Sequence, residues 1–327
     1  MINRRTFSKA VGLGVGATAM AAGSGAGSTA FAVDGETSAR PGAAPVIPTI
    51  APGTHTTFTG LKQVRAGVLD IGYAEAGPKH GPVAILLHGW PYDIHSFVDV
   101  APLLADAGYR VIVPYLRGHG STAFVSPATF RNAQQSAIAL DIIALMDALK
   151  IHKAVLAGFD WGSRTADIVA ALWPERVKAL VSVSGYLITN VETPALRDSL
   201  CRLVWDEVSP TWNFDDATFA RTAAAFQNPD YAAIVIHNYR WRLGLADGER
   251  RYDRYEQLLA AQPTIKVPTI TMDPALDPFL ASTDGTGYRK FFTGAYQHRV
   301  FSGIGHDAPQ EAPTAYAQAV VDADYLR

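Results

Sequence analysis

Short, mostly apolar runs alternate with segments of helical spacing along most of this chain. The runs lie at residues 83–87, 110–113, 153–157, 179–183, 267–272 and 299–301. A strand that is buried on both faces loses the polar alternation of a half-exposed strand. These runs therefore predict strands inside a parallel sheet, and residues 61–75, which alternate in part, predict one or two edge strands.

Apolar positions at helical spacing separate these runs. They are Phe97, Val100, Leu103 and Leu104 before Gly108, and Ile138, Ile142, Leu145, Met146 and Leu149 within residues 132–150. Such stripes indicate helices with one buried face. The alternation of strand and helix predicts an α/β fold, with a mostly parallel sheet covered by helices on both faces.

Residues 186–263 break this alternation. They contain no clear strand, and their aromatic residues cluster at Trp205, Trp212, Phe214, Phe219, Phe226, Tyr231, Tyr239, Trp241, Tyr252 and Tyr255. A helical insertion after a strand of an open α/β sheet lies over the carboxyl edge, where ligands bind. We therefore interpret residues 186–263 as a helical cap, inserted between the two parts of the core at 55–185 and 264–327.

The first 32 residues have the composition of a targeting segment. Arg4 and Arg5 precede a weakly apolar stretch rich in Gly and Ala, which ends in the small-x-small sequence of residues 30–32. This pattern predicts a twin-arginine-type signal peptide, with cleavage after Ala32 and export to the periplasm or beyond. The stretch is too polar for a spanning helix, so we expect no stable membrane anchor after cleavage. Residues 33–54 are predicted to be an N-terminal arm.

Composition narrows the classes of partner. The 327 residues carry a formal charge of -2, which gives no electrostatic reason for binding nucleic acid or an anionic membrane. Cys201 is the only cysteine, so the chain has no internal disulfide and no multi-thiolate metal site. We expect neither a metal nor a cofactor, and the sequence carries no signal of oligomeric state.

The strongest chemical signal is the sequence GFDWG at residues 158–162. It stands between an apolar run and a helical segment, and its two glycines permit the cramped turn of a nucleophile elbow. The raised residue in this elbow is Asp160. A carboxylate nucleophile forms an alkyl ester at a saturated carbon, such as an epoxide or alkyl halide carbon. The alternative is that Asp160 only caps the following helix, a role that requires no flanking glycines.

Two further loops supply partners for Asp160. HGWP at residues 88–91 follows a buried run, and we predict that the N–H groups of Trp90 and Trp161 form an oxyanion hole. Their side chains alternatively form only the pocket wall. His306 lies on a loop with Gly303 and Gly305 after the last predicted strand, which suits a base that activates water. We interpret His119 as structural.

The acid that orients His306 has two candidates. Asp273 lies at the end of the strand predicted at 267–272, and Asp277 lies four residues further along the loop. We prefer Asp277 because a residue deeper in the loop can turn back toward the histidine. Both candidates agree with the chain order of nucleophile, acid and histidine that this arrangement requires.

These motifs together resemble those of α/β-hydrolase fold epoxide hydrolases, along nearly the whole mature chain. The matching sequences are HGWP at 88–91, RGHGST at 117–122, GFDWG at 158–162 and GHDAPQEAP at 305–313. The resemblance implies hydrolysis of a small electrophile by an aspartate nucleophile. Haloalkane dehalogenases share HGxP and DWG, so dehalogenation is the alternative, although Trp90 replaces their usual Asn. A ligand-binding homologue without activity would have lost a catalytic residue.

The resemblance also implies further roles. HNYRW at 237–241 looks like the family motif that carries a cap tyrosine, so we expect Tyr239 to protonate the epoxide oxygen. The second cap tyrosine of the family has no counterpart between residues 203 and 212. Where the family commonly has strand-Gly-x-x-Asp, this chain has Pro274 in place of the glycine and keeps the spacing to Asp277.

Overall fold

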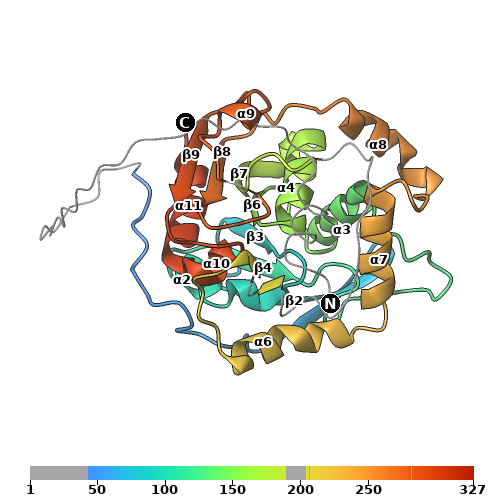
Figure 1. Ribbon diagram of the computed structural model, residues 1–327, viewed down its shortest axis with the longest axis horizontal. Helices are drawn as coiled ribbons and strands as arrows, with labels where there is room; N and C mark the ends of the chain where they lie inside the picture. Colours follow the sequence, from blue (N-terminus) through green and yellow to red (C-terminus); the bar gives the residue numbers. More distant parts are fainter. Residues whose placement is uncertain (1–42, 189–203, 206, 281) are drawn as a thin grey trace, which may run out of the picture.

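A mixed sheet lies at the centre of the computed structural model, which describes residues 43–188, 204–205, 207–280 and 282–327 (Figure 1). Its strands are β1 (Lys62–Ala66), β2 (Leu69–Ala76), β3 (Val83–Leu87), β4 (Arg110–Pro114), β5 (Ala123–Phe124), β6 (Ala154–Gly158), β7 (Val177–Val183), β8 (Thr269–Pro274) and β9 (Tyr296–Phe301). Within this part of the chain they are ordered β1-β2-β4-β3-β6-β7-β8-β9, with β5 beside β2. Pairing is antiparallel at β1, β2 and β5 and parallel from β4 to β9.

Helices cover both faces of this sheet (Figure 1). The helices of the core are η1 (Ile94–Phe97), α2 (Val100–Asp106), α3 (Gln135–Ala148), α4 (Trp161–Leu172), η2 (Pro174–Arg176), α9 (Thr286–Arg289), α10 (Ala308–Glu311) and α11 (Pro313–Tyr325). Helices α2 and α11 pack together on one face, and α3 and α4 on the other. Each pair closes a separate hydrophobic core against the sheet. The mostly parallel sheet with helices on both faces, which the alternating runs predict, is therefore present.

Between β7 and β8 the described residues form helices and contain no strand. The helices are α6 (Asp216–Ala223), η3 (Ala224–Gln227), α7 (Tyr231–Arg242), η4 (Arg250–Tyr252) and α8 (Asp253–Ala260). Some aromatic side chains of this region pack on one another, as Trp205 does against Trp212 and Phe219. Others pack on the core, as Tyr231 does on His119 and Tyr255 on Trp173. The aromatic residues in this part of the sequence thus pack both within the region and against the core.

The structure differs from the predicted elements at the margins of the sheet. Strand β9 begins at Tyr296, three residues before the predicted run. The sequence did not indicate this earlier start, because the side chains of β9 are mostly half-exposed and form no apolar run. Phe97 belongs to η1 rather than to the helix α2 that follows it. The two-residue strand β5 has no sequence signal, since a period of two needs more residues to be visible.

The described part of the N-terminal arm packs on the core. Ile47 is buried, and its N–H donates to the Gln318 side chain at 2.7 Å, while the N–H of Ile50 donates to Thr314 at 3.0 Å. The arm therefore lies along α11. The predicted signal peptide, residues 1–32, falls outside the described residues.

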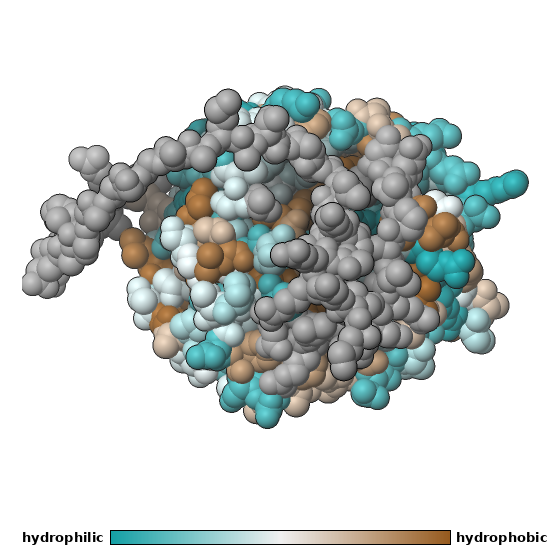
Figure 2. Space-filling model, in the orientation of Figure 1, coloured by the Kyte–Doolittle hydropathy of each residue, from teal (hydrophilic) through white to brown (hydrophobic). Residues whose placement is uncertain are grey.

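The visible face of the molecule mixes hydrophobic and hydrophilic residues over short distances (Figure 2). Among the described helices, none combines the length and the apolar composition that crossing a bilayer requires.

Candidate active site

The chain turns sharply between β6 and α4. Asp160 sits at this turn with φ 50° and ψ −118°, a conformation that costs a non-glycine residue free energy. A Cβ on Gly162 would collide with the carbonyl group of Leu87, and one on Gly158 would collide with the backbone of Gly162. The glycines at 158 and 162 are therefore required by close approach, as an elbow at the carboxyl end of β6 demands.

The side chain of Asp160 does not cap α4, so the helix-cap interpretation is wrong. Its Oδ1 instead accepts a hydrogen bond from the N–H of Trp90 at 2.7 Å. Strand β3, which precedes Trp90, lies directly beside β6, and this adjacency brings the two loops together. The side chain stays 18% exposed although the neighbouring elbow residues are buried, so small molecules can reach it.

His306 stands between two carboxylates. Its Nδ1 lies 2.6 Å from Oδ2 of Asp277, and its Nε2 lies 3.9 Å from Oδ2 of Asp160. The Asp277 carboxylate also accepts the N–H of Phe279 at 2.9 Å, which fixes its orientation. The three residues come from the loops after β6, β8 and β9, so the sheet brings together side chains that are up to 146 residues apart in the sequence.

The Asp273 carboxylate is hydrogen-bonded to residues other than His306. Its Oδ1 accepts the hydroxyl of Tyr288 at 2.8 Å, and its Oδ2 accepts both the N–H and the hydroxyl of Thr283 at 2.9 Å. At the end of β8 its side chain is thus engaged with the segment that leads to α9. Of the two acids considered from the sequence, Asp277 is the one in contact with His306.

The charge of His306 depends on its two carboxylates. Burial opposes the protonated imidazole, but the Asp277 carboxylate, its hydrogen bond and the charge of Asp160 outweigh burial and raise the pKa of His306 to about 9. The imidazole is therefore protonated at neutral pH while Asp160 is ionised. Removal of the Asp160 charge lowers this pKa.

The loop of His306 is held by residues that sequence reasoning missed. The backbone N–H of His306 donates to Oγ of Ser209 at 2.9 Å, and that hydroxyl donates to Glu311 at 2.5 Å. The same carboxylate accepts the N–H of Gly305 at 2.8 Å. Glu311 belongs to the GHDAPQEAP motif, but its role becomes visible only when Ser209, a residue between β7 and β8, is placed against it.

Tyr239 lies over the two tryptophans that flank Asp160. Its ring centre is 5.2 Å from that of Trp90 and 6.0 Å from that of Trp161. Burial, and after it the charge of Asp160, raises the pKa of Tyr239 above its usual value of 10. The hydroxyl is therefore protonated over the physiological pH range and can donate.

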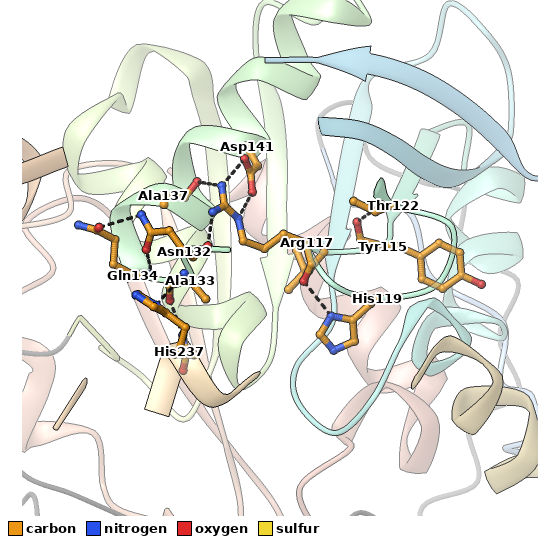
Figure 3. Close-up of polar contacts among 12 residues, drawn as sticks. Tyr115, Arg117, His119, Thr122, Asn132, Ala133, Gln134, Ala137, Asp141 and His237 are labelled. Atoms are coloured by element: carbon orange, nitrogen blue, oxygen red, sulfur yellow. Dashed lines mark hydrogen bonds and ion pairs between the residues drawn. The ribbon is translucent and has the colours of Figure 1, made fainter. Parts of the chain in front are cut away.

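The two residues before Tyr239 anchor its helix to the core, and Figure 3 shows the contact of one of them, His237, with Ala133. His237 Nδ1 accepts the N–H of Ala133 at 3.0 Å, and the Asn238 amide donates to the carbonyl of the same residue at 2.7 Å. The loop around Ala133 is itself held by Arg117, whose buried guanidinium pairs with Asp141 (Figure 3). The motif HNYRW thus fixes α7, and with it the position of Tyr239.

The other buried histidines near the site are structural. His119 is fully buried, its ring packs against Trp161 and Tyr231, and burial, then His88, lowers its pKa well below the usual value. His88 accepts the N–H of Leu116 at 3.1 Å and is also kept neutral by burial. The ring nitrogens of His88 bond to Gly89 and Leu116 and Nδ1 of His119 bonds to Arg117, so neither ring is hydrogen-bonded to Asp160. Within the described ranges no group of three His, Cys, Asp or Glu side chains could hold a metal ion.

The structure therefore brings together all six residues selected from the sequence: Asp160, His306, Asp277, Tyr239, Trp90 and Trp161. The N–H of Trp161 is the first of α4, so it has no partner inside its own helix. Sequence reasoning missed Arg242, whose guanidinium carbon lies 5.8 Å from the centre of the Tyr239 ring, and the buried Arg164 on α4. The sequence could have indicated Arg164, because a residue four positions after the nucleophile is expected on the same side of the helix that follows it.

Residues 82–262 match the family described as alpha/beta hydrolase fold. A crystal structure from Klebsiella pneumoniae, described as a "putative epoxide hydrolase", is 54% identical over 82% of this chain and 98% of that chain, with a TM-score of 0.78. Epoxide hydrolase I of potato (Solanum tuberosum) shares the fold, with a TM-score of 0.62 at 18% identity over 80% of this chain and 98% of that chain.

The curated proteins that this chain resembles also include epoxide hydrolases. Epoxide hydrolase A of Mycobacterium tuberculosis is 26% identical over 76% of this chain and 92% of its own length. Epoxide hydrolase 3 of Siraitia grosvenorii is 40% identical over 33% of this chain, and that match spans about a third (34%) of the plant protein. This chain belongs to the α/β-hydrolase family and is an epoxide hydrolase-like enzyme within it.

Proposed function

We propose that this enzyme hydrolyses epoxides to vicinal diols through a covalent ester on Asp160. The observation that carries the proposal is the position of one carboxylate, held by the Trp90 N–H at 2.7 Å and facing His306 at 3.9 Å. Tyr239 faces the same space across the two tryptophan rings. The similarity to epoxide hydrolases supports the same substrate class.

In the first step Oδ2 of Asp160 attacks a ring carbon of the epoxide. The carbon–oxygen bond of the ring breaks, and Tyr239 donates its proton to the released oxygen. Oδ1 stays bound to the Trp90 N–H and becomes the carbonyl oxygen of the ester. The product of this step is a hydroxyalkyl ester and a tyrosinate.

In the second step His306, oriented by Asp277, removes a proton from water, and the hydroxide adds to the ester carbon. The charge that develops on Oδ1 is stabilised by the N–H groups of Trp90 and Trp161. Collapse of this intermediate releases the diol, whose leaving oxygen takes the proton from His306. The carboxyl group of Asp160 then ionises, and its proton restores Tyr239.

The charges around His306 ensure that ester formation comes before ester hydrolysis. While Asp160 is ionised, its charge and that of Asp277 keep the imidazole protonated, with a pKa of about 9. Ester formation removes one of the two negative charges, so the pKa of His306 falls. The imidazolium then releases its proton to solvent, and the neutral imidazole is a competent base only after the ester has formed.

Haloalkane dehalogenation is a second candidate, because the two tryptophans next to Asp160 have buried indole N–H groups. The indole Nε1–H of Trp90, as distinct from its backbone N–H, is buried without an acceptor among the described residues. That of Trp161 is also buried, and it lies close enough to the Tyr239 hydroxyl to lower its pKa without reaching full hydrogen-bond geometry. Both can stabilise a leaving halide.

An assay of matched epoxides and haloalkanes separates the two functions. We expect diol formation from epoxides and little or no halide release from haloalkanes of equal chain length, since an alkoxide needs the proton that Tyr239 supplies. Halide release without diol formation from any epoxide would assign the site to dehalogenation.

Replacement of Tyr239 by phenylalanine removes this proton donor and keeps the ring. We expect the rate of ester formation from an epoxide to fall about 100-fold, a typical contribution of a general acid. The rate of ester hydrolysis should change little. Single-turnover quenched-flow experiments separate the two rates, and a selective loss of the hydrolysis rate would contradict the role of Tyr239.

Asp277→Asn and Asp273→Asn form a matched pair that tests the triad acid. We expect Asp277→Asn to lower kcat by about 10³-fold, because the amide favours the wrong tautomer of His306. Asp273→Asn should retain most activity and lower the free energy of unfolding by about 1–3 kcal/mol, since Tyr288 and Thr283 lose their charged acceptor. Steady-state kinetics and urea unfolding of both variants check this, and the reverse ranking of activities would assign the acid to Asp273.

We also propose that the protein is exported in the folded state, supported by the paired arginines and the residue pattern ending at Ala32. Arg4→Lys combined with Arg5→Lys should leave the precursor inside the cell. Cell fractionation and N-terminal sequencing check this, and unchanged export of the double variant would contradict a twin-arginine signal.

A further inference from the structure

The segment at residues 207–212, which lies between β7 and α6 in the chain, contacts the loop that carries His306. The backbone N–H of His306 is shared between two acceptors of this segment, the carbonyl of Val208 at 3.1 Å and Oγ of Ser209 at 2.9 Å. The Ser209 hydroxyl in turn donates to Oε1 of Glu311 at 2.5 Å. A chain of hydrogen bonds thus joins a segment distant in the sequence to the backbone of the proposed base.

The Glu311 carboxylate joins this segment to the His306 loop. Its Oε1 accepts the Ser209 hydroxyl, and its Oε2 accepts the N–H of Gly305, the residue before His306, at 2.8 Å. Ser209 and Glu311 are only 1% and 8% exposed. Removal of the Ser209 hydroxyl would therefore leave a buried carboxylate oxygen without its donor, and a buried acceptor without a partner is costly.

The segment also approaches the His306 loop closely. A Cβ on Gly305 would lie 2.5 Å from Cα of Ser209 and 2.7 Å from its Oγ. The φ of Gly305 lies outside the left-handed region, so this close approach, rather than the backbone conformation, requires a glycine at 305. One turn further along, the Thr211 hydroxyl donates to the carbonyl of Gly303 at 3.1 Å. The loop is therefore held at several points in front of His306.

The imidazole ring of His306 is held by a stack of rings. The Tyr92 ring lies between Trp205 and His306, with its centre 4.8 Å from that of Trp205 and 5.9 Å from that of His306. The Trp205 indole N–H donates to the carbonyl of Pro91 at 3.1 Å, which fixes the outer member of the stack. Since Asp277 holds Nδ1 at 2.6 Å, the ring is restrained at an edge and on a face.

The position of the His306 backbone matters for one of the two steps. In the second step Nε2 must take a proton from a water that attacks the ester carbon of Asp160. A displacement of about 1 Å in such a group can lower a rate about 10²-fold. The first step has no such requirement, because Asp160 attacks the epoxide without help from the imidazole.

We propose that Ser209, together with Glu311, is a positioning residue for ester hydrolysis. Its hydroxyl fixes the His306 loop where the imidazole can activate water, and it acts through the backbone of His306 rather than on the substrate. This inference rests on the proposed function and adds to it a residue from outside the known motifs. If the hydroxyl served only the stability of the fold, its removal would not slow one step selectively.

Ser209→Ala removes the hydroxyl and little volume. We expect the rate of ester hydrolysis to fall about 10-fold to 100-fold and the rate of ester formation to change little. Ser209→Thr, which keeps a hydroxyl, should retain most of the hydrolysis rate. Single-turnover quenched-flow experiments measure both rates. An unchanged hydrolysis rate in folded Ser209→Ala protein, or an equal loss of both rates, would overturn the inference.

Ser302→Ala is the matched control, because Ser302 is an exposed serine that precedes His306 on the same loop. It should leave both rates within about twofold, as surface substitutions usually do. If circular dichroism shows that Ser209→Ala does not fold, Glu311→Gln takes its place, because an amide has one acceptor oxygen where the carboxylate has two. A selective loss of the hydrolysis rate is again expected, and an equal loss of both rates again overturns the inference.

A spectrum of the free enzyme separates this inference from the proposed function. At pH 6, below the His306 pKa of about 9, the imidazolium donates Nδ1–H to Asp277 across 2.6 Å. A proton in so short a charge-assisted bond gives a far-downfield NMR resonance, which His306→Gln identifies by its loss. We expect this resonance in the wild-type protein and in Ser209→Thr, and its loss or broadening in Ser209→Ala.

The two measurements fail independently. If no epoxide reacts, the proposed function fails, and the positioning of His306 by Ser209 stands if the resonance differs as expected between wild-type and Ser209→Ala protein. A resonance that is the same in both proteins, or absent from both, would overturn the positioning role even if epoxides are hydrolysed.

Discussion

Asp160→Asn is expected to abolish epoxide turnover, with kcat falling by about 10⁴-fold or more. The amide is a poor nucleophile, while its size and its hydrogen bond with the Trp90 N–H are close to those of the carboxylate. Asparagine and aspartate are nearly equal in size, so the substitution adds no bulk at this strained position, where φ is 50° and ψ is −118°. The variant should therefore fold normally and fail only in the formation of the ester. Steady-state diol assays and circular dichroism check both expectations.

A carboxylate far from the site provides the control. Asp147 on α3 is 64% exposed on its side chain and pairs with Arg176, so Asp147→Asn should keep full activity. Intact mass must show that the amide at position 160 persists during the assay, because water activated by His306 can hydrolyse it back to the acid. An Asp160→Asn protein that retains its amide and turns over epoxides at the wild-type rate would exclude the carboxylate as nucleophile.

His306→Gln is expected to stop the cycle after the first step. The rate of ester hydrolysis should fall by about 10³-fold to 10⁴-fold, while the ester still forms, because attack by Asp160 does not need the imidazole. The enzyme should thus release less than one equivalent of diol and then stall. His80→Gln, a change at an exposed loop residue, should behave as the wild type.

The pH dependence of the wild-type enzyme tests the same role of His306. In the resting state its pKa is about 9, and loss of the Asp160 charge lowers that value in the ester. Since only the neutral imidazole accepts a proton, the rate of ester hydrolysis should rise with pH through a midpoint below 9. The Tyr239 proton that ester formation needs is present in the resting enzyme across this range, because burial raises the pKa of Tyr239. A single-turnover hydrolysis rate that falls as the pH rises from 6 to 9 would contradict this role.

The central strands were predictable because both of their faces are buried. Strands such as β3 and β6 carry no polar residue that could interrupt an apolar run. The margins were less predictable, because β9 is mostly half-exposed and β5 has two residues. The described part of the arm gave no periodic signal, since its contacts with α11 are made by its backbone with side chains of that helix.

The candidate site also contains residues that were predictable from the sequence and residues that were not. Asp160 and His306 stand in glycine-rich turns, whose tight backbone is visible in the sequence. Asp273 and Asp277 could be ranked but not separated, because the contact of Asp277 with His306 depends on how the loop after β8 folds back. The bond between Ser209 and Glu311 joins segments 102 residues apart, and no local pattern reports such a contact.

The most direct test of the account is the intact mass of His306→Gln protein after incubation with an epoxide. The account predicts a mass increase of one epoxide molecule, which peptide mapping places on Asp160 and which is absent from the double variant with Asp160→Asn. A folded His306→Gln protein that gains no mass from any epoxide, or gains it at another residue, would contradict covalent catalysis by Asp160.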